Sequence, residues 1–220
     1  MARLRVQNFT VSLDGYAAGP SQSLADPMGV GGHKLHEWVF QTRSGLAMIG
    51  QDGGDTGTND EYLRARAQGI GATIMGRNMF GPVRGPWLDE SWRGWWGDRP
   101  PYDHDVFVLT HHPRSDLVMS NATRFHFVEA APRAVLDMAM EAARGKDVAL
   151  AGGAATVIQF LQAGLVDELH LVIAPVLLGD GERLFGGVDM GGYACQPLTS
   201  SAGVAHVHLV RTTPAPAPVA

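Results

Sequence analysis

The stretch Val148–Gly181, VALAGGAATVIQFLQAGLVDELHLVIAPVLLGDG, decides the fold class of this chain. Its opening apolar run stops at Gly152 and Gly153, and a helix is predicted at once over Ala154–Ala163. Another strand-like run, Glu168–Ile173, follows the next turn. The order strand, helix, strand is typical of α/β proteins, in which helices cover a mostly parallel sheet.

The rest of the chain extends this pattern on both sides. We predict further strands at Leu4–Ser12, Ala72–Met75, Val106–Thr110, Arg124–Val128 and Val204–Val210, and further helices at Asp60–Gln68 and Pro132–Ala143. The stretches 15–57 and 82–101 show no sustained period, apart from a helix-like piece at His36–Gln41. Such long irregular stretches are often functional. We expect one α/β domain over residues 1–211 and a disordered Pro/Ala-rich tail over 212–220.

The bulk composition narrows the possible partners and the compartment. The 220 residues carry a net charge of −5, with no block of Lys or Arg, which disfavours nucleic acid and anionic membranes as partners. The sequence has no apolar run of the roughly 20 residues that a membrane helix needs. Its single cysteine, Cys195, excludes an internal disulfide framework, so the cytoplasm is the expected compartment.

The glycines at the end of the Val148–Ala151 run have two interpretations. They allow a sharp turn with close packing, or they let a phosphate approach the backbone N–H groups at a helix N-terminus. Residues Gly152, Gly153, Ala154, Ala155 and Thr156 are the candidates for such a phosphate turn. Neither GxGxxG nor GxxxxGK[ST] occurs here, so the motif alone leaves both interpretations open.

Two other predicted strands end in groups that suit phosphate. Gly76 and Arg77 follow one strand, and Thr110, His111 and Arg114 follow another. Guanidinium groups form charge-assisted hydrogen bonds with phosphate, and ligands of open α/β sheets lie beyond the carboxyl ends of the strands. Together with the Gly152–Thr156 turn, these strand ends predict one dinucleotide site that accommodates an additional phosphate. The alternative for each is an ordinary surface turn.

With these motifs in order along residues 3–211, the chain resembles the dihydrofolate reductase superfamily. It is most similar to the branch that contains the reductase domain of bacterial riboflavin biosynthesis. The matching segments are Ser12–Gly15 (SLDG), Ile74–Arg77 (IMGR), Val108–Thr110 (VLT), Ala151–Gly153 (AGG), Asp167–Leu169 (DEL), Ala174–Gly181 (APVLLGDG) and Leu184-Phe185.

The resemblance implies a three-layer fold, with a central, mostly parallel sheet flanked by helices and antiparallel C-terminal strands. It also implies NADPH as the hydride donor, a homodimer, and a cis peptide between Gly152 and Gly153. Gly76 and Arg77 would lie along the pyrophosphate, and Thr110, His111 and Arg114 would face the adenosine 2′-phosphate. The chain departs from the family pattern at Met79, where a threonine is usual, and at Ala154, where folate enzymes have a third glycine.

Two carboxylates are the candidate catalytic groups. The resemblance places Asp60 at the spacing of the acid that contacts the pterin in folate reductases, and Asp14 at the riboflavin-type position after the first strand. Each has a structural alternative: Asp60 in a first helical turn favours the helix dipole, and Asp14 before Gly15 suits a turn.

Aromatic and histidine clusters complete the candidate residues. Trp38 is the candidate for a wall of the substrate site, together with Trp87, Trp92, Trp95 and Trp96, whose alternatives are core packing or an oligomer interface. The histidine pairs lack a convergent ligand set, so we expect no metal.

These observations predict an NADPH-dependent reductase that transfers a hydride to a C=N or C=O bond of a small, cyclic substrate. The irregular 15–57 stretch departs from the folate pattern, and ribose-phosphate reduction lacks an evident basic cluster in the substrate loops. The alternative is a non-catalytic protein that binds NADPH, or a flavin- or folate-like ligand, as a sensor.

Overall fold

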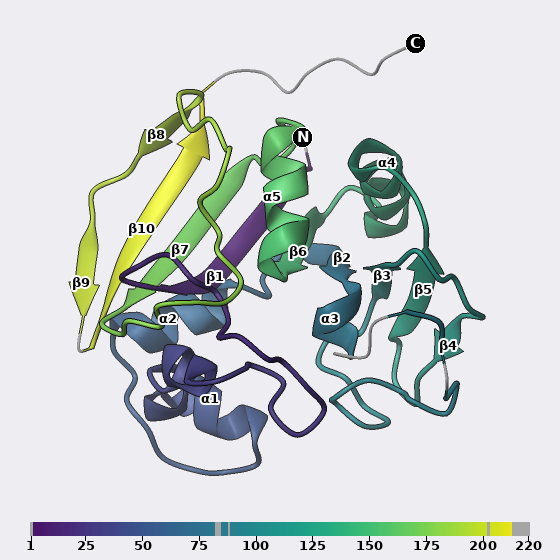
Figure 1. The fold of residues 1–220 in the computed structure, drawn as a ribbon, viewed down its shortest axis with the longest axis horizontal. Helices are drawn as coiled ribbons and strands as arrows, with labels where there is room; N and C mark the ends of the chain where they lie inside the picture. The colour runs from purple at the N-terminus through teal and green to yellow at the C-terminus, as the bar shows by residue number, and fades with distance from the viewer. Residues whose placement is uncertain (1, 82–84, 88, 202, 213–220) are drawn as a thin grey trace.

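The computed structural model describes residues 2–81, 85–87, 89–201 and 203–212, so positions 213–220 of the expected tail lie outside the described residues. Within these residues, ten strands form one sheet in the order β4-β5-β3-β2-β6-β1-β7-β10-β8, with β9 paired to β10 (Figure 1). Six strands run parallel: β1 (Leu4–Ser12), β2 (Ile70–Gly76), β3 (Asp105–Leu109), β5 (Arg124–Val128), β6 (Asp147–Gly152) and β7 (Glu168–Ala174).

Antiparallel strands complete both edges of this sheet. At one edge lies β4 (Leu117–Val118), and at the other lie β8 (Tyr193–Cys195), β9 (Thr199–Ser201) and β10 (Val204–Arg211). The central, mostly parallel sheet and the antiparallel C-terminal strands are therefore confirmed.

Successive side chains of the strands pack on opposite faces of the sheet, which produces three layers. In β2, Ile74 belongs to the core beneath α4 (Pro132–Ala143) and α5 (Ala154–Gln162), whereas Met75 packs on the other face with Phe80 of α3 (Arg77–Phe80). Val172 of β7 likewise packs against Leu63 of α2 (Thr58–Ala65). Helices therefore cover both faces, as the resemblance implied (Figure 1).

The helices and strands predicted from hydrophobic periodicity are present. The short helices and strands whose sequences show no such periodicity were not predicted. The expected helix at His36–Gln41 is instead two short 3₁₀ helices, Gly32–His36 and Val39–Gln41. A further helix, α1 (Arg43–Met48), follows them, capped by Thr42, whose Oγ1 accepts a hydrogen bond from Gly45 N at 3.0 Å.

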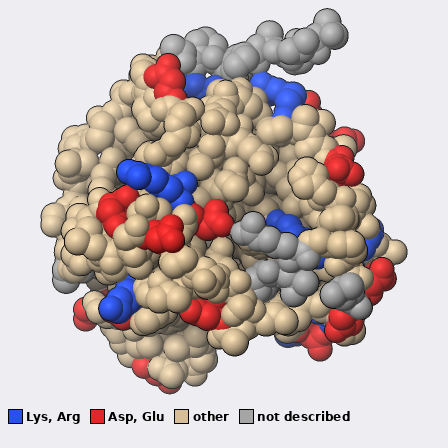
Figure 2. All heavy atoms as spheres, viewed as in Figure 1, with Lys and Arg blue, Asp and Glu red and all other residues tan. Residues whose placement is uncertain are grey.

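No described helix is long and apolar enough to cross a membrane. On the face drawn in Figure 2, basic and acidic side chains lie interspersed.

The first strand separates from its neighbour partway along its length. Strand β1 pairs with β6 at Leu4 and Arg5, and it then continues beside β7 as far as Ser12. A register shift between Val6 and Phe9 marks a bulge in which Asn8 has a φ of 52°. Bulges bend a strand and redirect its side chains. The sheet is therefore opened between β1 and β6 toward the carboxyl ends of the strands.

Candidate active site

A cavity of about 1070 Å³ lies at this opening. Its walls include the carboxyl ends of β2, β3, β5 and β6, the first turn of α5, the bulged part of β1 and the loops around residues 17–28. This location is the one expected for ligands of open α/β sheets, and the volume is slightly above the usual range for small-molecule sites.

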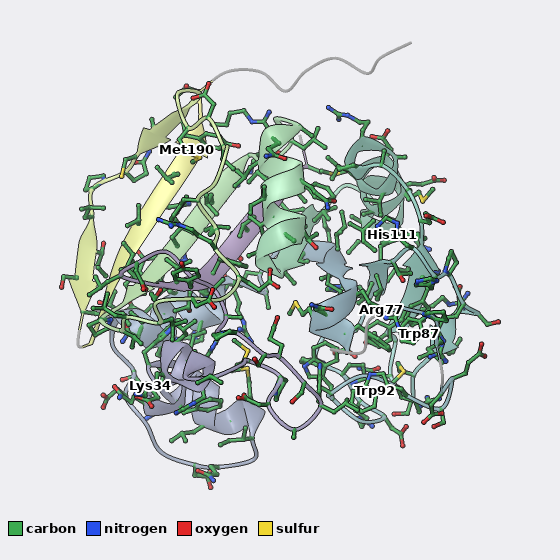
Figure 3. All side chains as sticks on the ribbon, viewed as in Figure 1. Lys34, Arg77, Trp87, Trp92, His111 and Met190 are labelled. Carbon is green, nitrogen blue, oxygen red and sulfur yellow. The ribbon has the colours of Figure 1, made fainter. Side chains whose placement is uncertain are left out.

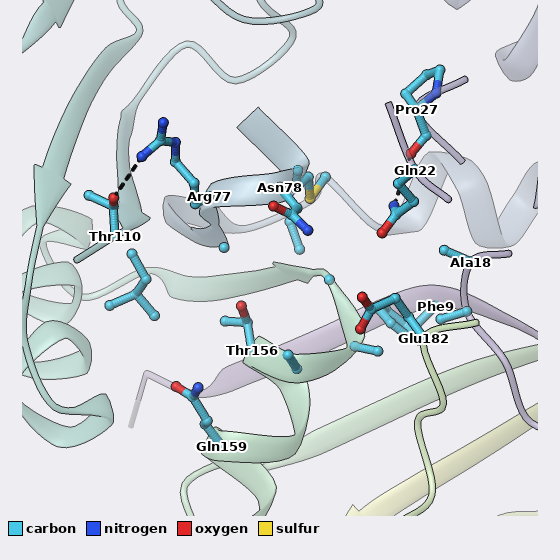
Figure 4. Close-up of a pocket in the computed structure, with 18 of the residues that line it drawn as sticks. Phe9, Ala18, Gln22, Pro27, Arg77, Asn78, Thr110, Thr156, Gln159 and Glu182 are labelled. Atoms are coloured by element: carbon cyan, nitrogen blue, oxygen red, sulfur yellow. Dashed lines mark hydrogen bonds between the residues drawn. The ribbon is translucent and has the colours of Figure 1, made fainter. Parts of the chain in front are cut away.

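The cavity has two chemically different ends. Figure 4 shows Arg77 and Thr110 at one end, and Gln22 and Pro27 at the opposite end. We call these the strand end and the loop end. The strand end contains the groups that the sequence assigned to phosphate, and the loop end contains groups that the sequence did not single out.

Three glycines near the first turn of α5 have different roles. A Cβ on Gly76 would collide with Oγ1 of Thr156, and a Cβ on Gly152 would lie 3.0 Å from the ring of Phe9. These two glycines therefore permit close packing. A Cβ on Gly153 would meet no described protein atom within 4 Å, and Gly153 lines the cavity. The Gly152–Gly153 peptide is cis, as the resemblance implied.

The turn at Gly153 leaves backbone donors at the cavity. Gly153 is the N-cap of α5, and its carbonyl accepts hydrogen bonds from the N–H groups of Thr156 and Val157, each at 3.1 Å. The first N–H groups of a helix have no intrahelical acceptor. Ala154, Ala155 and Thr156 all line the cavity, so this helix end has the donors and the positive dipole that an anion requires.

Arg77 supplies a positive charge at the strand end. Its guanidinium lies 3.2 Å from the ring centre of Trp87, and its NH1 group donates to Oγ1 of Thr110 at 3.2 Å and to the carbonyl of Gly85 (Figures 3 and 4). Its Nε and NH2 atoms are buried without a hydrogen-bond partner among the described residues. Burial, followed by the nearby charge of Arg114, lowers the pKa of Arg77. The guanidinium of Arg77 is therefore fixed in position, and two of its nitrogen atoms have no hydrogen-bond acceptor among the described residues.

The three candidate phosphate-binding residues after β3, which are Thr110, His111 and Arg114, do not all line the cavity. Thr110 and His111 line the cavity, and the exposed imidazole of His111 lies 3.2 Å from the carboxylate of Glu129. Arg114 is not among the lining residues. Its guanidinium donates instead to the carbonyls of Trp92 and Glu90. The structure therefore brings Thr110 and His111, but not Arg114, to the strand end.

The two candidate carboxylates also lie outside the cavity wall. Asp60 is 2% exposed, and its Oδ1 accepts a hydrogen bond from Ser44 N at 2.7 Å, which joins α2 to α1. Its burial would raise its pKa, but the hydrogen bonds from Ser44 and two nearby arginines leave the pKa below its usual value.

Asp14 ties the end of β1 to the loop that follows β7. It accepts hydrogen bonds from the Ser12 hydroxyl and from the backbone N–H groups of Leu178 and Gly179. The Ser12 bond contributes most to lowering the pKa of Asp14 to about 2. Both carboxylates therefore join segments of the described structure, and neither lines this cavity.

Most of the tryptophans are packed in the protein interior or against its loops. Trp38 is 4% exposed, packs between β7 and α2, and donates from Nε1 to Thr10 Oγ1 at 3.2 Å; it is not among the lining residues. Trp87, Trp92 and Trp96 pack around Phe80 and the phenylalanines of β5. Trp95 alone of the five lines the cavity.

The loop end presents functional groups that the sequence analysis missed. Glu182 and Phe9 lie on the same side of the cavity as Gln22 in Figure 4, and Asn8 and His36 also line the cavity. Glu182 follows the APVLLGDG segment and exchanges backbone hydrogen bonds with Ala17 and Ala18. The position of Glu182 directly after a matching motif was a signal available in the sequence. The bulge that redirects Asn8 has no comparable sequence signature.

Comparisons with known proteins agree with this architecture. The profile of a family described as RibD C-terminal domain matches residues 6–209. A curated relative, "Uncharacterized protein YyaP" of Bacillus subtilis (strain 168), is 54% identical over 41 residues, a segment that covers 19% of this chain and 22% of that protein.

Solved structures share the fold at low sequence identity. A putative riboflavin biosynthesis protein from Shewanella sp. PV-4 has a TM-score of 0.63 and 19% identity, with 97% of this chain and 100% of that one covered. A deaminase/reductase from Thermotoga maritima has a TM-score of 0.55 and 13% sequence identity, with 96% of this chain and 56% of that one covered. Dihydrofolate reductase from Enterococcus faecalis, complexed with NADP(H), has a TM-score of 0.53 and 12% sequence identity, with 96% of this chain and 97% of that one covered.

Proposed function

This chain belongs to the RibD C-terminal domain family, and from that membership we propose that it is an NADPH-dependent reductase of a small cyclic substrate. The family and its structural neighbours support a reductase-like role. The observation that carries the proposal is the coincidence of a free helix N-terminus, an open Gly153 and the half-buried cation Arg77 in one cavity.

The strand end fits the phosphates of a dinucleotide. The N–H groups of Ala154 and Ala155 would bind the pyrophosphate, and the absence of a side chain at Gly153 leaves room for it. Arg77, Thr110 and His111 would bind the additional phosphate of NADPH, with Arg77 replacing Arg114 as the principal cation. NADPH supplies a hydride when bound.

The loop end of the cavity fits the second requirement of the reaction, which is a proton donor. The carboxyl groups among the lining residues are those of Glu129 and Glu182, and Glu129 faces His111 at the strand end. In this proposal a carboxyl oxygen of Glu182 therefore relays a proton to the reduced substrate, directly or through water. Phe9 and Met28 provide apolar walls that orient a ring and exclude water.

The test is NADPH oxidation followed at 340 nm with a panel of cyclic imines, lactams and ketones. We expect at least one panel compound to accelerate oxidation, and we expect Glu182→Gln to reduce that rate by at least tenfold while NADPH still binds. Saturable NADPH binding with no oxidation by any compound would favour the non-catalytic sensor instead. Failure to bind NADPH at all would contradict both the reductase and the NADPH-binding sensor.

A further inference from the structure

The end of β5 places an acidic side chain at the strand end of the cavity. Glu129 directly follows β5, and Thr110 and His111 follow the neighbouring strand β3. These two strands are paired through Leu109 and Val128, and a hydrogen bond from Thr110 N to Val128 O at 2.9 Å extends the pairing. Glu129, Thr110 and His111 all line the cavity. A carboxylate therefore lies among the groups that the proposed function assigns to a phosphate.

The side chains of Glu129 and His111 are both accessible to a ligand. Their exposed fractions are 57% and 93%, and Oε1 of Glu129 lies 3.2 Å from Nδ1 of His111. Because both residues also line the cavity, a bound cofactor can contact either of them without repacking the interior.

The hydrogen bond between these two residues uses a donor that a phosphate would need. A carboxylate oxygen only accepts, so the proton of this bond is on Nδ1 of His111. In a neutral imidazole the other nitrogen, Nε2, is then an acceptor, as every oxygen of a phosphate dianion is. Glu129 therefore competes with a phosphate for the N–H group of His111.

The charge of Glu129 acts in the same direction. Arg77, whose NH1 group donates to Thr110 Oγ1 at 3.2 Å, attracts a phosphate monoester, which carries a charge of about −1.5 to −2 near pH 7. The carboxylate of Glu129 repels that phosphate, whereas a ribose hydroxyl can donate to it. Acidic residues at strand ends of other dinucleotide-binding sheets recognise a ribose hydroxyl in this way. Arg77 and Glu129 therefore favour different cofactors.

We propose that Glu129 is a specificity residue that lowers the preference of this cavity for NADPH over NADH. Its carboxylate accepts a hydrogen bond from the 2′-hydroxyl of NADH and repels the 2′-phosphate of NADPH. The preference produced by Arg77 is thereby held below the value that this cation alone would give. The inference deepens the proposed function and rests on it for the position of the adenosine ribose.

The test is calorimetric titration of the full chain and of Glu129→Gln with NADPH and with NADH. The amide removes the charge, and its oxygen still accepts from a hydroxyl. We expect Glu129→Gln to bind NADPH about fivefold more tightly, which is the scale of one like-charge contact in water, and to bind NADH as the unmodified protein does. Glu129→Lys should tighten NADPH binding further, because it adds an attractive charge.

Two controls separate the charge from an effect on packing. Glu141→Gln removes the same charge from an exposed position in the last turn of α4, outside the cavity lining, and it should change neither affinity. The gain of Glu129→Gln should disappear in about 1 M salt, where the Debye length is about 3 Å. A gain that comes from altered packing would persist in salt.

The outcomes distinguish this inference from the proposed function. Unchanged NADPH affinity in folded Glu129→Gln, an equal gain for NADH, an equal gain in Glu141→Gln, or a gain that persists in salt would overturn the role of Glu129. The expected gain in a protein that oxidises NADPH with no panel compound would support that role and contradict the reductase. No binding of either cofactor by any of these proteins would contradict both.

Discussion

Arg77 and Arg114 are the two arginines that could select the phosphorylated cofactor, and the structure separates them. Arg77 lines the cavity with two donors unpaired, whereas Arg114 is held by two backbone carbonyls. We predict that Arg77→Ala removes most of the preference for NADPH over NADH, because the cation that pairs with the extra phosphate is lost. Fluorescence titration with both cofactors measures this preference. Arg114→Ala should retain it, and loss of preference in Arg114→Ala alone would reverse the assignment.

Gly153 tests whether the turn serves a ligand or only the fold. An added Cβ enters open space, and the φ of Gly153 is −72°, so alanine is accommodated in the protein itself. We predict that Gly153→Ala weakens NADPH binding at least tenfold, about 1.4 kcal/mol, measured below its melting temperature. A folded Gly153→Ala protein with unaltered NADPH affinity would show that the glycine serves only the turn.

The residues that follow strands were predictable, and the residues placed by tertiary packing were not. Gly76, Arg77, Thr110 and the Gly153 turn follow apolar runs, and the carboxyl ends of parallel strands meet at one edge of a sheet. Arg114 lies only a few residues further, but its direction depends on the carbonyls of the 89–92 loop. Spacing alone carries no information on that loop, and the same holds for Asn8 in its bulge.

Strands β7 and β10 hold a buried histidine pair that links stability to pH. Nε2 of His206 faces Oδ1 of Asn59 at 2.8 Å, and Nδ1 of His206 faces Nε2 of His170 at 3.0 Å. Because Asn59 Oδ1 accepts, His206 donates from Nε2 and accepts at Nδ1 from His170, which suits two neutral rings. Burial, followed by the charges of His206 and His208, lowers the pKa of His170 to about 3.

This shift gives a stability that falls with acidification. Unfolded histidine has a pKa near 6.5, so between about 6.5 and 3 the unfolded chain binds more protons than the folded one. We predict that the free energy of unfolding falls by about 2.5 kcal/mol between pH 7 and pH 4.5 from this residue, because each pH unit below the unfolded pKa removes about 1.4 kcal/mol. Urea unfolding measures it. His170→Gln should flatten the dependence, and the exposed control His33→Gln should not; an equally steep His170→Gln profile would contradict the assignment.

Helix α1 anchors the carboxylate that the family resemblance marked as catalytic. Because Asp60 Oδ1 accepts from Ser44 N, Asp60→Asn replaces a charge-assisted bond in a buried position. We predict a loss of about 1–3 kcal/mol in stability, with cofactor affinity unchanged in the folded protein. Thermal unfolding and NADPH titration separate the two effects. Unaltered stability together with lost turnover would restore the catalytic interpretation.

Elements with a clear period were predicted nearly to their ends, as with β1 and α4. Those missed are short: α1, the two-residue strand β4, and the edge strands β8 and β9. Such segments are too brief to establish a period, and they form because a neighbouring strand or a capping hydroxyl fixes them. The long stretch 15–57, which shows no periodic pattern of apolar residues, lines the loop end of the cavity. Its residues form a wall of the site and do not form a long helix or strand.

For the whole molecule, we predict a homodimer that uses the loop after β7. Leu13 and Leu177 are 62% and 72% exposed, and the N–H of Leu13 bonds to the carbonyl of Val176, so the two leucines lie on paired segments. Exposed apolar side chains gathered in this way are typical of interfaces. Light scattering at micromolar concentration should give twice the chain mass of 23.5 kDa. Leu177→Asp should yield a monomer, whereas Val118→Asp, on the opposite sheet edge, should not. A monomeric unmodified protein would contradict the prediction.

The central claim is that this cavity binds NADPH through its phosphates, and calorimetric titration of the unmodified protein with NADPH and NADH tests it most directly. We predict one NADPH per chain, bound at least tenfold more tightly than NADH, a difference of about 1.4 kcal/mol. The preference should shrink as salt is raised, because the extra phosphate is recognised by charge. Equal dissociation constants for the two cofactors, or no saturable heat with either, would contradict the account.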